Sequence, residues 1–169
     1  MNYYQLFELE AAPLIDKSSL KKKYLQLSRE YHPDFADNSD EESQAKALEV
    51  SANINKAYKI FNNPSLSIQY FLQYIEVITE EEKYPLPPDF LMDMMDINEA
   101  LEDAKASGNQ TEIGAISHKI AMLEEELYTA IAEIVTTKAP QNISADQLAE
   151  LKLYYFKKKY LQRILEGLS

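Results

Sequence analysis

The tripeptide His32-Pro33-Asp34 is the chain's clearest candidate for chemistry, because it sets an imidazole beside a carboxylate. Proline disfavours helical backbone at the residue before it, so a helix that reaches Tyr31 must end there and the chain must turn outward. The ordinary explanation is a turn, in which proline fixes φ and aspartate bonds nearby amides. A rigid corner can also project a carboxylate toward a partner. No substrate cleft is indicated around His32, so we interpret it as a positioning group rather than a general base.

The rest of the composition argues against catalytic and cofactor chemistry. The 169 residues contain no cysteine, which excludes disulfides, thiol nucleophiles and cysteine-ligated iron–sulfur clusters. Two histidines, His32 and His118, are too few for the usual structural zinc site. Three glycines provide neither a G-x-G-x-x-G loop nor a P-loop. We therefore expect no metal, no cofactor and no catalysis by the chain alone.

The charge balance argues against nucleic acid and membrane partners. The sequence has 17 Lys and Arg against 28 Asp and Glu, a net charge of −11. This sign opposes binding to phosphate backbones. No stretch approaches the roughly eighteen apolar residues of a membrane span, and the N-terminus lacks a basic region followed by an apolar run. We expect a soluble protein of a reducing compartment, the cytoplasm.

Helical periodicity runs through nearly the whole chain and predicts an all-α protein. The segment 76–88 contains three prolines, which cannot continue a helix, and Asp89 after them can cap a new one. We expect domains at 1–75 and 89–169 joined by a linker at 76–88. Residues 1–75 carry 8 basic and 10 acidic side chains, and residues 76–169 carry 9 and 18, which suggests different partners. The expected helices cover about 3–9, 18–31, 42–61, a segment around 68–72, 89–106, 110–136 and 145–168.

The helix that leads to the corner has an apolar face and a basic face. Helical geometry brings its apolar residues within about 60° of one another. These residues are Leu20, Tyr24, Leu27 and Tyr31. Lys22 and Arg29 lie opposite, with Lys21 beside them and no acidic residue between them. Such a face suits an acidic partner surface.

The helix expected after Pro88 carries an apolar strip that its own core does not need. Its core seam consists of Phe90, Met94, Ile97, Leu101 and Ala104. Leu91, Met92 and Met95 fall on the far side, bordered by Asp96 and Glu99. Single exposed apolar residues are common, but a contiguous strip indicates a protein-binding face that methionine makes adaptable.

Several motifs in order carry a family resemblance. They are Tyr3-Tyr4-x-Leu6-Phe7-x-Leu9, the run 20–24 leading into 31–34, and Ile54-Asn55-Lys56-Ala57-Tyr58. Together they resemble the J-domain of the DnaJ class over residues 1 to about 62. The run 51–58, then Asn63-Pro64 and Tyr70-Phe71-Leu72, resembles the HscB family of J-type co-chaperones, which serve iron–sulfur cluster assembly. That similarity continues to the end of the chain.

The resemblance implies a J-domain hairpin with a His-Pro-Asp loop, a C-terminal three-helix bundle, and a non-enzymatic role in the bacterial cytoplasm. It implies that His32, Pro33 and Asp34 trigger ATP hydrolysis in a DnaK/HscA-type chaperone. Lys22, Lys23 and Arg29 would then carry the docking face. The positions that would hold an IscU-type iron–sulfur scaffold are Leu91, Met92, Met95, Asp96 and Glu99, with an aromatic contact at Tyr155 or its neighbour Phe156.

The last helix leaves that aromatic contact open. Helical geometry places Phe156 opposite the expected core stripe and Tyr155 at its edge, so either side chain could meet a partner. The core stripe consists of Leu151, Tyr154, Leu161, Leu165 and Leu168. We interpret the lysine run 157–159 as a solvated face.

Three departures from the family pattern weaken parts of this reading. Leu25-Gln26 stand where many J-domains have Arg-Lys, Phe35 replaces a frequent lysine, and Ser67 replaces an arginine of several members. One rival function is a J-like binding module without ATPase coupling. Another is a metal hydrolase built on the glutamate runs 80–82 and 124–126. A surface position is the favoured reading of His118.

Overall fold

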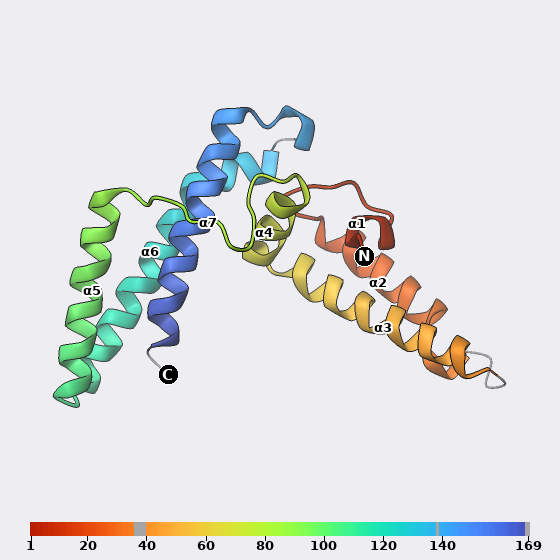
Figure 1. Cartoon of the computed structure of the whole chain (residues 1–169), viewed down its shortest axis with the longest axis horizontal. Coiled ribbons are helices and arrows are strands. Elements are labelled where there is room, and N and C mark those ends of the chain that lie inside the picture. Colours follow the sequence, from red (N-terminus) through yellow and green to blue (C-terminus); the bar gives the residue numbers. More distant parts are fainter. Residues whose placement is uncertain (36–39, 138, 168–169) are drawn as a thin grey trace. The chain divides into compact units, whose positions relative to one another are not determined.

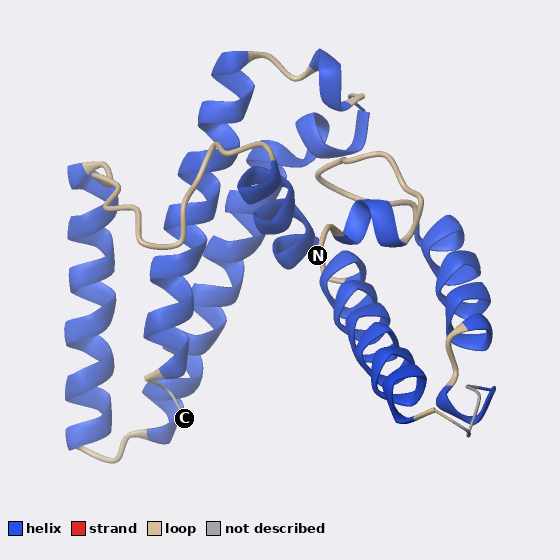
Figure 2. Ribbon diagram, turned by 45° about the vertical axis from the view of Figure 1, so that its right-hand side comes forward, coloured by secondary structure: helices blue, strands red, loops and turns tan. Residues whose placement is uncertain are grey.

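Every regular element in the described part of the chain is a helix (Figure 1, Figure 2). The structure is a computed structural model that describes residues 1–35, 40–137 and 139–167. Two compact units divide the chain, Met1–Glu76 and Val77–Ser169. Within the described residues, no helix combines the length and apolarity that crossing a bilayer requires. The predicted all-α class is confirmed.

The first unit is a helical hairpin with a short helix on either side of it in the sequence. Its elements are α1 Tyr3–Leu6, α2 Lys17–Glu30, the 3-10 turn η1 Pro33–Phe35, α3 Glu41–Asn62 and α4 Pro64–Tyr74. α2 packs along α3 to form the hairpin (Figure 1). Polar side chains define the starts of its helices: Asp16 accepts the Ser19 N–H at 2.8 Å before α2, and Asn63 accepts the Leu66 N–H at 3.2 Å before α4.

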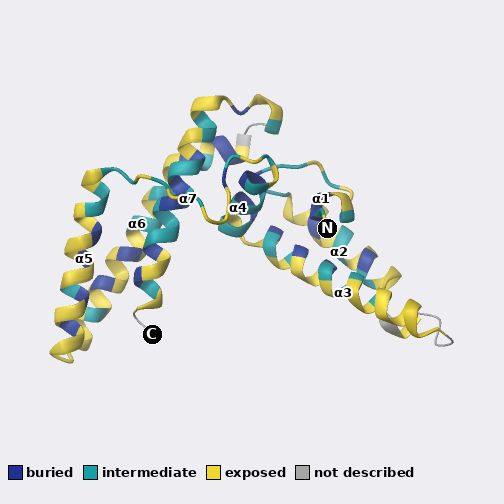
Figure 3. Cartoon of the chain, viewed as in Figure 1, coloured by how far each residue is buried: buried dark blue, intermediate teal, exposed yellow. Residues whose placement is uncertain are grey.

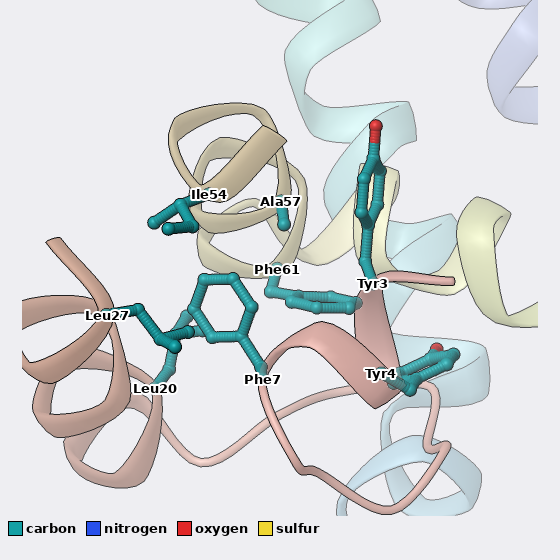
Figure 4. Close-up of a cluster of buried hydrophobic side chains, with 8 residues drawn as sticks. All are labelled: Tyr3, Tyr4, Phe7, Leu20, Leu27, Ile54, Ala57 and Phe61. Carbon is teal, nitrogen blue, oxygen red and sulfur yellow. The ribbon is translucent and has the colours of Figure 1, made fainter. Parts of the chain in front are cut away.

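An aromatic core centred on Phe7 holds this hairpin together (Figure 4). The Phe7 side chain is fully buried between α2 and α3, and its ring meets the Phe61 ring edge-on at 6.0 Å. The buried cluster consists of Tyr3, Tyr4, Phe7, Leu20, Leu27, Ile54, Ala57 and Phe61. The Tyr4 hydroxyl donates to the Ala12 carbonyl at 3.0 Å, and burial raises the pKa of Tyr4. The N-terminal segment therefore packs against both long helices and fixes their relative position within this unit.

One residue of the predicted apolar face of α2 lies outside the core. Leu20 and Leu27 are buried and Tyr24 packs beside them, but Tyr31 is 36 % exposed. Tyr31 follows the last helical residue, and its N–H donates to the Leu27 carbonyl as the helix ends. The chain has already begun to turn, so the helical spacing no longer directs this side chain inward. Tyr31 belongs to the corner rather than to the core.

The second unit is the predicted three-helix arrangement. Its elements are α5 Pro88–Ala106, α6 Gln110–Thr137, the 3-10 turn η2 Pro140–Asn142 and α7 Ala145–Glu166. α6 packs against both α5 and α7. Its buried cluster consists of Met94, Ile97, Leu101, Ala104, Ile116, Ile120, Leu161 and Ile164. Ser144 and Gln147 form a reciprocal capping box that starts α7.

The segment predicted as a linker, 76–88, is partly packed against α7. Glu82 forms an ion pair with Lys152 at 2.5 Å, and the Tyr84 ring stacks on the Phe156 ring at 4.5 Å between centroids. α5 begins at Pro88, with Asp89 in its first turn, so Asp89 is not the cap that the sequence predicted. Proline at the first position needs no N–H partner, which allows this start without a side-chain cap.

Candidate functional site

The His-Pro-Asp corner is a compact turn whose polar groups face solvent. The Phe35 N–H donates to the His32 carbonyl at 2.9 Å, which closes η1. The Asp34 N–H donates to Nδ1 of His32 at 3.2 Å. The Asp34 side chain is 83 % exposed. The imidazole therefore braces the backbone of the turn while the carboxylate stays free to meet a partner.

The hydrogen bond from the Asp34 amide defines the tautomer of the neutral imidazole. Because Nδ1 accepts the Asp34 amide, neutral His32 carries its proton on Nε2. Nδ1 also lies 3.6 Å from Oδ2 of Asp34, an approach that becomes an ion pair when the imidazole is protonated. In the neutral state the corner thus presents one N–H donor and one carboxylate. This arrangement suits recognition and positioning.

Phe35 adds an apolar group to the same corner. Its side chain is 77 % exposed, and its ring meets the His32 ring edge-on with centroids 5.8 Å apart. A lysine frequently occupies this position in the J-domain pattern, so the corner of this chain carries an aromatic ring in place of a charge. Phe35 is more exposed than Tyr31, its counterpart on the other side of the tripeptide.

The basic face of α2 is a shallow open hollow that contains both charge and apolar surface. It is lined by Lys22, Leu25, Gln26, Arg29 and Glu30. Lys22 and Arg29 are exposed, as predicted. No acidic residue lies between Lys22 and Arg29, but Glu30 follows Arg29 at the end of the helix and borders the same hollow. Leu25 is exposed between the two cations.

Lys23 is occupied within the first unit. Its ammonium group forms an ion pair with Glu8, and this hydrogen bond holds the pKa of the Glu8 carboxyl below its usual range. Its side chain is only 27 % exposed. Lys23 therefore ties α2 to the residues after α1 and does not share the hollow of Lys22 and Arg29.

The strip on α5 is narrower than the sequence predicted. Met92 and Met95 are 64 % and 65 % exposed, and the acidic residues Asp96 and Glu99 are exposed beside them. Much of α5 is coloured as exposed in Figure 3. Leu91 is half-buried. Two methionines therefore make up the outward surface, with Leu91 at its edge. The core seam of the same helix is buried as expected, with Phe90 partly buried beside it.

The expectation that Phe156 points away from all packing is wrong. Phe156 is 7 % exposed, because the Tyr84 ring covers it with an interplanar angle of 1°. Tyr155 is half-buried and keeps part of its surface accessible. Burial raises the pKa of Tyr155, with a further rise from Glu80 and an opposing effect of Arg163. Of the two aromatic candidates, Tyr155 is the one with surface left for a partner.

The lysine run 157–159 is not a simple solvated face. All three side chains are half-buried, and each has its own contact. Lys157 lies over the Phe90 ring at 5.3 Å, Lys158 pairs with Glu124 at 3.4 Å, and Lys159 lies over the Tyr155 ring at 5.9 Å. Sequence spacing alone could not reveal the first two contacts, because Phe90 and Glu124 lie on other helices. The third contact joins residues four apart on α7.

The remaining candidates stay isolated. His118 is exposed on α6. Among the residues that the structure describes, no group of three or more His, Cys, Asp or Glu side chains could hold a metal ion. Glu82 and Glu124, one from each glutamate run, are paired with lysines. The metal hydrolase hypothesis thus gains no ligand set from these residues.

Comparison with known proteins covers both units. Residues 2–70 match the family model described as the DnaJ domain, and residues 86–169 match the one described as the HSCB C-terminal oligomerisation domain. A co-chaperone HscB homologue of Colwellia psychrerythraea is 30 % identical over 162 residues, covering 91 % of this chain and 90 % of the relative. The co-chaperone HscB of Proteus mirabilis is 30 % identical over 173 residues, covering 99 % and 98 %.

Solved structures give the same result for the fold. The crystal structure of the human co-chaperone protein HscB matches with a TM-score of 0.78 at 24 % identity, over 99 % of this chain and 80 % of the human chain. The chaperone HscB from Vibrio cholerae matches with a TM-score of 0.61 at 25 % identity over the whole of both chains. With its DnaJ-type first unit and HscB-type second unit, the chain belongs to the HscB family of J-domain co-chaperones.

Proposed function

We propose that this chain is an adaptor that delivers an IscU-type iron–sulfur scaffold to a DnaK/HscA-type chaperone and stimulates the ATPase of that chaperone. It would act in the bacterial cytoplasm. One observation carries the proposal: two exposed surfaces of different chemistry lie on separate units of a chain of this family. The first surface is the corner of His32 and Asp34, and the second is the methionine strip of α5. A chain with both can hold two proteins at once.

The corner would act on the chaperone without catalysing hydrolysis itself. Lys22 and Arg29 supply a screened field that orients an acidic partner surface. Pro33 limits the backbone of the turn, and His32 braces it through the Asp34 amide. Asp34 then enters a polar network of the chaperone from a defined direction. The free energy of the conformational change comes from the partner's bound ATP, and this chain only selects the state that hydrolyses it.

The strip would act by burial of apolar surface. Full burial of a methionine or leucine side chain contributes about 1.5 to 3 kcal/mol, and ordering and association costs remove much of that total. A net affinity near micromolar, about −8 kcal/mol, is consistent with two methionines, half of Leu91 and part of Tyr155. Asp96 and Glu99 would set the register from the rim. Phe156 is left out of this contact set because Tyr84 covers it.

We assign one partner to each part of the chain: the chaperone to residues 1–75 and the scaffold to residues 89–169, with 76–88 between them. Residues 1–75 carry a charge of −2 and residues 76–169 carry −9, so the two parts offer different fields to a partner.

A J-like module that binds the chaperone without coupling is the second candidate. It is favoured by one observation, the presence of Glu30 and Leu25 in the hollow that should dock the chaperone. Both residues weaken the basic field of α2. Under this alternative the chain binds, but hydrolysis in the partner stays at its basal rate.

An ATPase assay distinguishes the two candidates. The chaperone is measured alone, with this chain, with the scaffold and with both. The adaptor predicts stimulation by the chain and a larger stimulation when the scaffold is present. Binding with an unchanged hydrolysis rate would support the uncoupled module instead.

A further inference from the structure

The second unit contains an open hollow that the motifs did not reveal. It lies between the segment 82–86 and one face of α7. Positions 156, 159, 160 and 163 of α7 recur at spacings of three and four, so they share one side of the helix. The lining residues used below are Lys83, Tyr84, Phe156, Lys159, Tyr160 and Arg163.

The hollow is held in shape before any ligand arrives. The Tyr84 ring stacks on Phe156 with centroids 4.5 Å apart and forms an apolar floor. Lys152 pairs with Glu82 and also lies over the Tyr84 ring at 5.8 Å. Glu82 in addition accepts the Thr79 N–H at 3.4 Å. An ion pair and a ring stack thus fix the segment on α7, so a ligand would pay little to order this surface.

The charge of the hollow is opposite to that of its surroundings. Residues 77–169 contain 9 basic and 17 acidic side chains. The lining of the hollow has the cations Lys83, Lys159 and Arg163 against the single carboxylate of Glu82. That carboxylate is already paired with Lys152. The hollow therefore keeps a local excess of positive charge inside an acidic unit.

The three cations are available to an incoming anion. Over residues 77–137 and 139–167, the ion pairs of this unit join Lys152 to Glu82 and Lys158 to Glu124. Neither pair involves Lys83 or Arg163. Lys159 lies over the Tyr155 ring, a contact that leaves its ammonium hydrogens free to donate. A carboxylate in the hollow would be the natural counter-ion of these groups.

The hollow adjoins Tyr155, the aromatic residue of the proposed scaffold contact set. Lys159, which lines the hollow, lies over the Tyr155 ring at 5.9 Å. The Tyr160 ring, which also lines the hollow, packs edge-on against Phe90 with centroids 6.1 Å apart. Phe90 lies in the first turn of α5, the helix that carries the strip. The strip in turn is bordered by Asp96 and Glu99. This unit thus has a positive hollow beside Tyr155 and a negative rim beside the methionines of α5.

We propose that the hollow is a second contact site for the scaffold and takes a carboxylate side chain that projects from it. Arg163 and Lys83 pair with that carboxylate, and the Tyr84–Phe156 stack contacts its apolar stem. This inference rests on the proposed scaffold binding and predicts the orientation in which the scaffold binds. The scaffold must present an acidic group to α7 and a neutral or basic group to Asp96 and Glu99. The reversed orientation sets like charges against each other at both ends, so the scaffold binds in one orientation.

Charge reversal at one residue tests the inference. Arg163→Glu is compared with Lys119→Glu, which makes the same change in net charge at an exposed position of α6. Calorimetric titration with the scaffold is run at two salt concentrations. We expect Arg163→Glu to weaken binding about tenfold or more and to flatten the salt dependence, because a solvent-accessible ion pair is replaced by repulsion. Lys119→Glu should stay within about twofold of the wild type at both salt concentrations.

Further variants keep the outcomes distinguishable. Arg163→Gln removes the charge without adding repulsion, and a thermal melt of each variant shows that the fold is retained. Arg163→Gln should weaken binding by a smaller factor than Arg163→Glu. Equal affinity of wild type and Arg163→Glu at both salt concentrations would overturn the inference while leaving scaffold binding intact. If the wild type itself does not bind the scaffold, the proposed function fails first and the inference falls with it.

Discussion

The corner of the first unit and the strip of the second unit are exposed for different reasons. The corner projects because Pro33 and the end of α2 force the chain out of the helix, and its exposed groups include the polar side chains of His32 and Asp34. The strip lies in the middle of a regular helix, where the core already has its own seam. The corner offers a partner a few groups in a fixed position and direction, whereas the strip offers an area of apolar surface. Recognition at the corner should therefore depend on geometry and charge, and recognition at the strip on apolar burial.

The largest effect is expected at the corner. Asp34→Ala and His32→Gln should abolish stimulation of the chaperone ATPase, because each removes a polar group that nothing else at the corner replaces. Circular dichroism should be unchanged, since both side chains are exposed. Asp103→Ala, an exposed aspartate on α5, is the matched control and should stimulate normally. Full stimulation by either corner variant would remove the corner from the mechanism.

The next effect is expected at the strip. Met92→Ala with Met95→Ala should weaken scaffold binding by about a hundredfold, and adding Leu91→Ala should carry binding beyond ordinary detection, because about 3 kcal/mol or more of burial is lost. Both methionines are exposed, so the melting temperature should change little. Met122→Ala, an exposed methionine on α6, is the control.

The alternative result at the strip has its own signature. Buried leucine or methionine residues cost about 2 to 5 kcal/mol each when truncated to alanine. A large drop in melting temperature would mean that the strip belongs to the core. Unchanged melting with unchanged titration would place the scaffold contact elsewhere on the unit.

The two surfaces should also differ in their response to salt. Lys22→Ala with Arg29→Ala should weaken chaperone binding about tenfold at low salt, since exposed ion pairs contribute about 0.2 to 1 kcal/mol each. The salt dependence of chaperone binding should flatten, and scaffold binding should not change. Lys46→Ala with Lys56→Ala removes the same charge from exposed positions of α3 and serves as the control. An unaltered salt slope would exclude α2 as the docking face.

We expect a smaller effect on chaperone binding at Phe35, which would show that the corner also uses an apolar contact. Phe35→Ala should weaken chaperone binding about fivefold, because partial burial of the ring contributes roughly 1 kcal/mol. Phe35→Lys should recover affinity at low salt and lose it at high salt. Leu48→Ala removes another exposed apolar side chain, on α3, and should have no effect. If Phe35→Ala binds the chaperone as tightly as the wild type, only the polar groups of the corner take part in binding.

The smallest effect concerns pH and the second unit. The hydrogen bond from Lys152 holds the pKa of the Glu82 carboxyl below its usual range. A lowered folded pKa stabilises the folded arrangement above the ordinary glutamate pKa of about 4.3, and this contribution is lost as the pH falls through the lowered value. We expect the Tyr84 ring to loosen from Phe156 in acid, visible as a change in its proton NMR shift. Glu82→Gln should show that loosened shift at neutral pH and no acid transition. An acid transition retained in Glu82→Gln would assign the effect to another group.

Much of this arrangement could be predicted from the sequence, because the spacing of apolar residues within a helix indicates which of its faces is buried. The apolar spacing of α5 correctly separated Met94 and Ile97 from the exposed Met92 and Met95. Errors arose where a distant segment decides the environment. Phe156 is covered by Tyr84, and Lys23 is held by Glu8 across the hairpin unit. Periodicity describes one helix at a time and contains no information on which loop will cover it.

A mixing experiment tests most directly the central claim that one chain must carry both surfaces. The chaperone ATPase is measured with the scaffold and one of three additions: wild type, Asp34→Ala alone, or an equimolar mixture of Asp34→Ala with Met92→Ala/Met95→Ala. The adaptor account predicts that the extra stimulation by scaffold appears with the wild type and not with the mixture, because no single molecule in the mixture has both surfaces intact. Full recovery of that stimulation by the mixture would contradict the account.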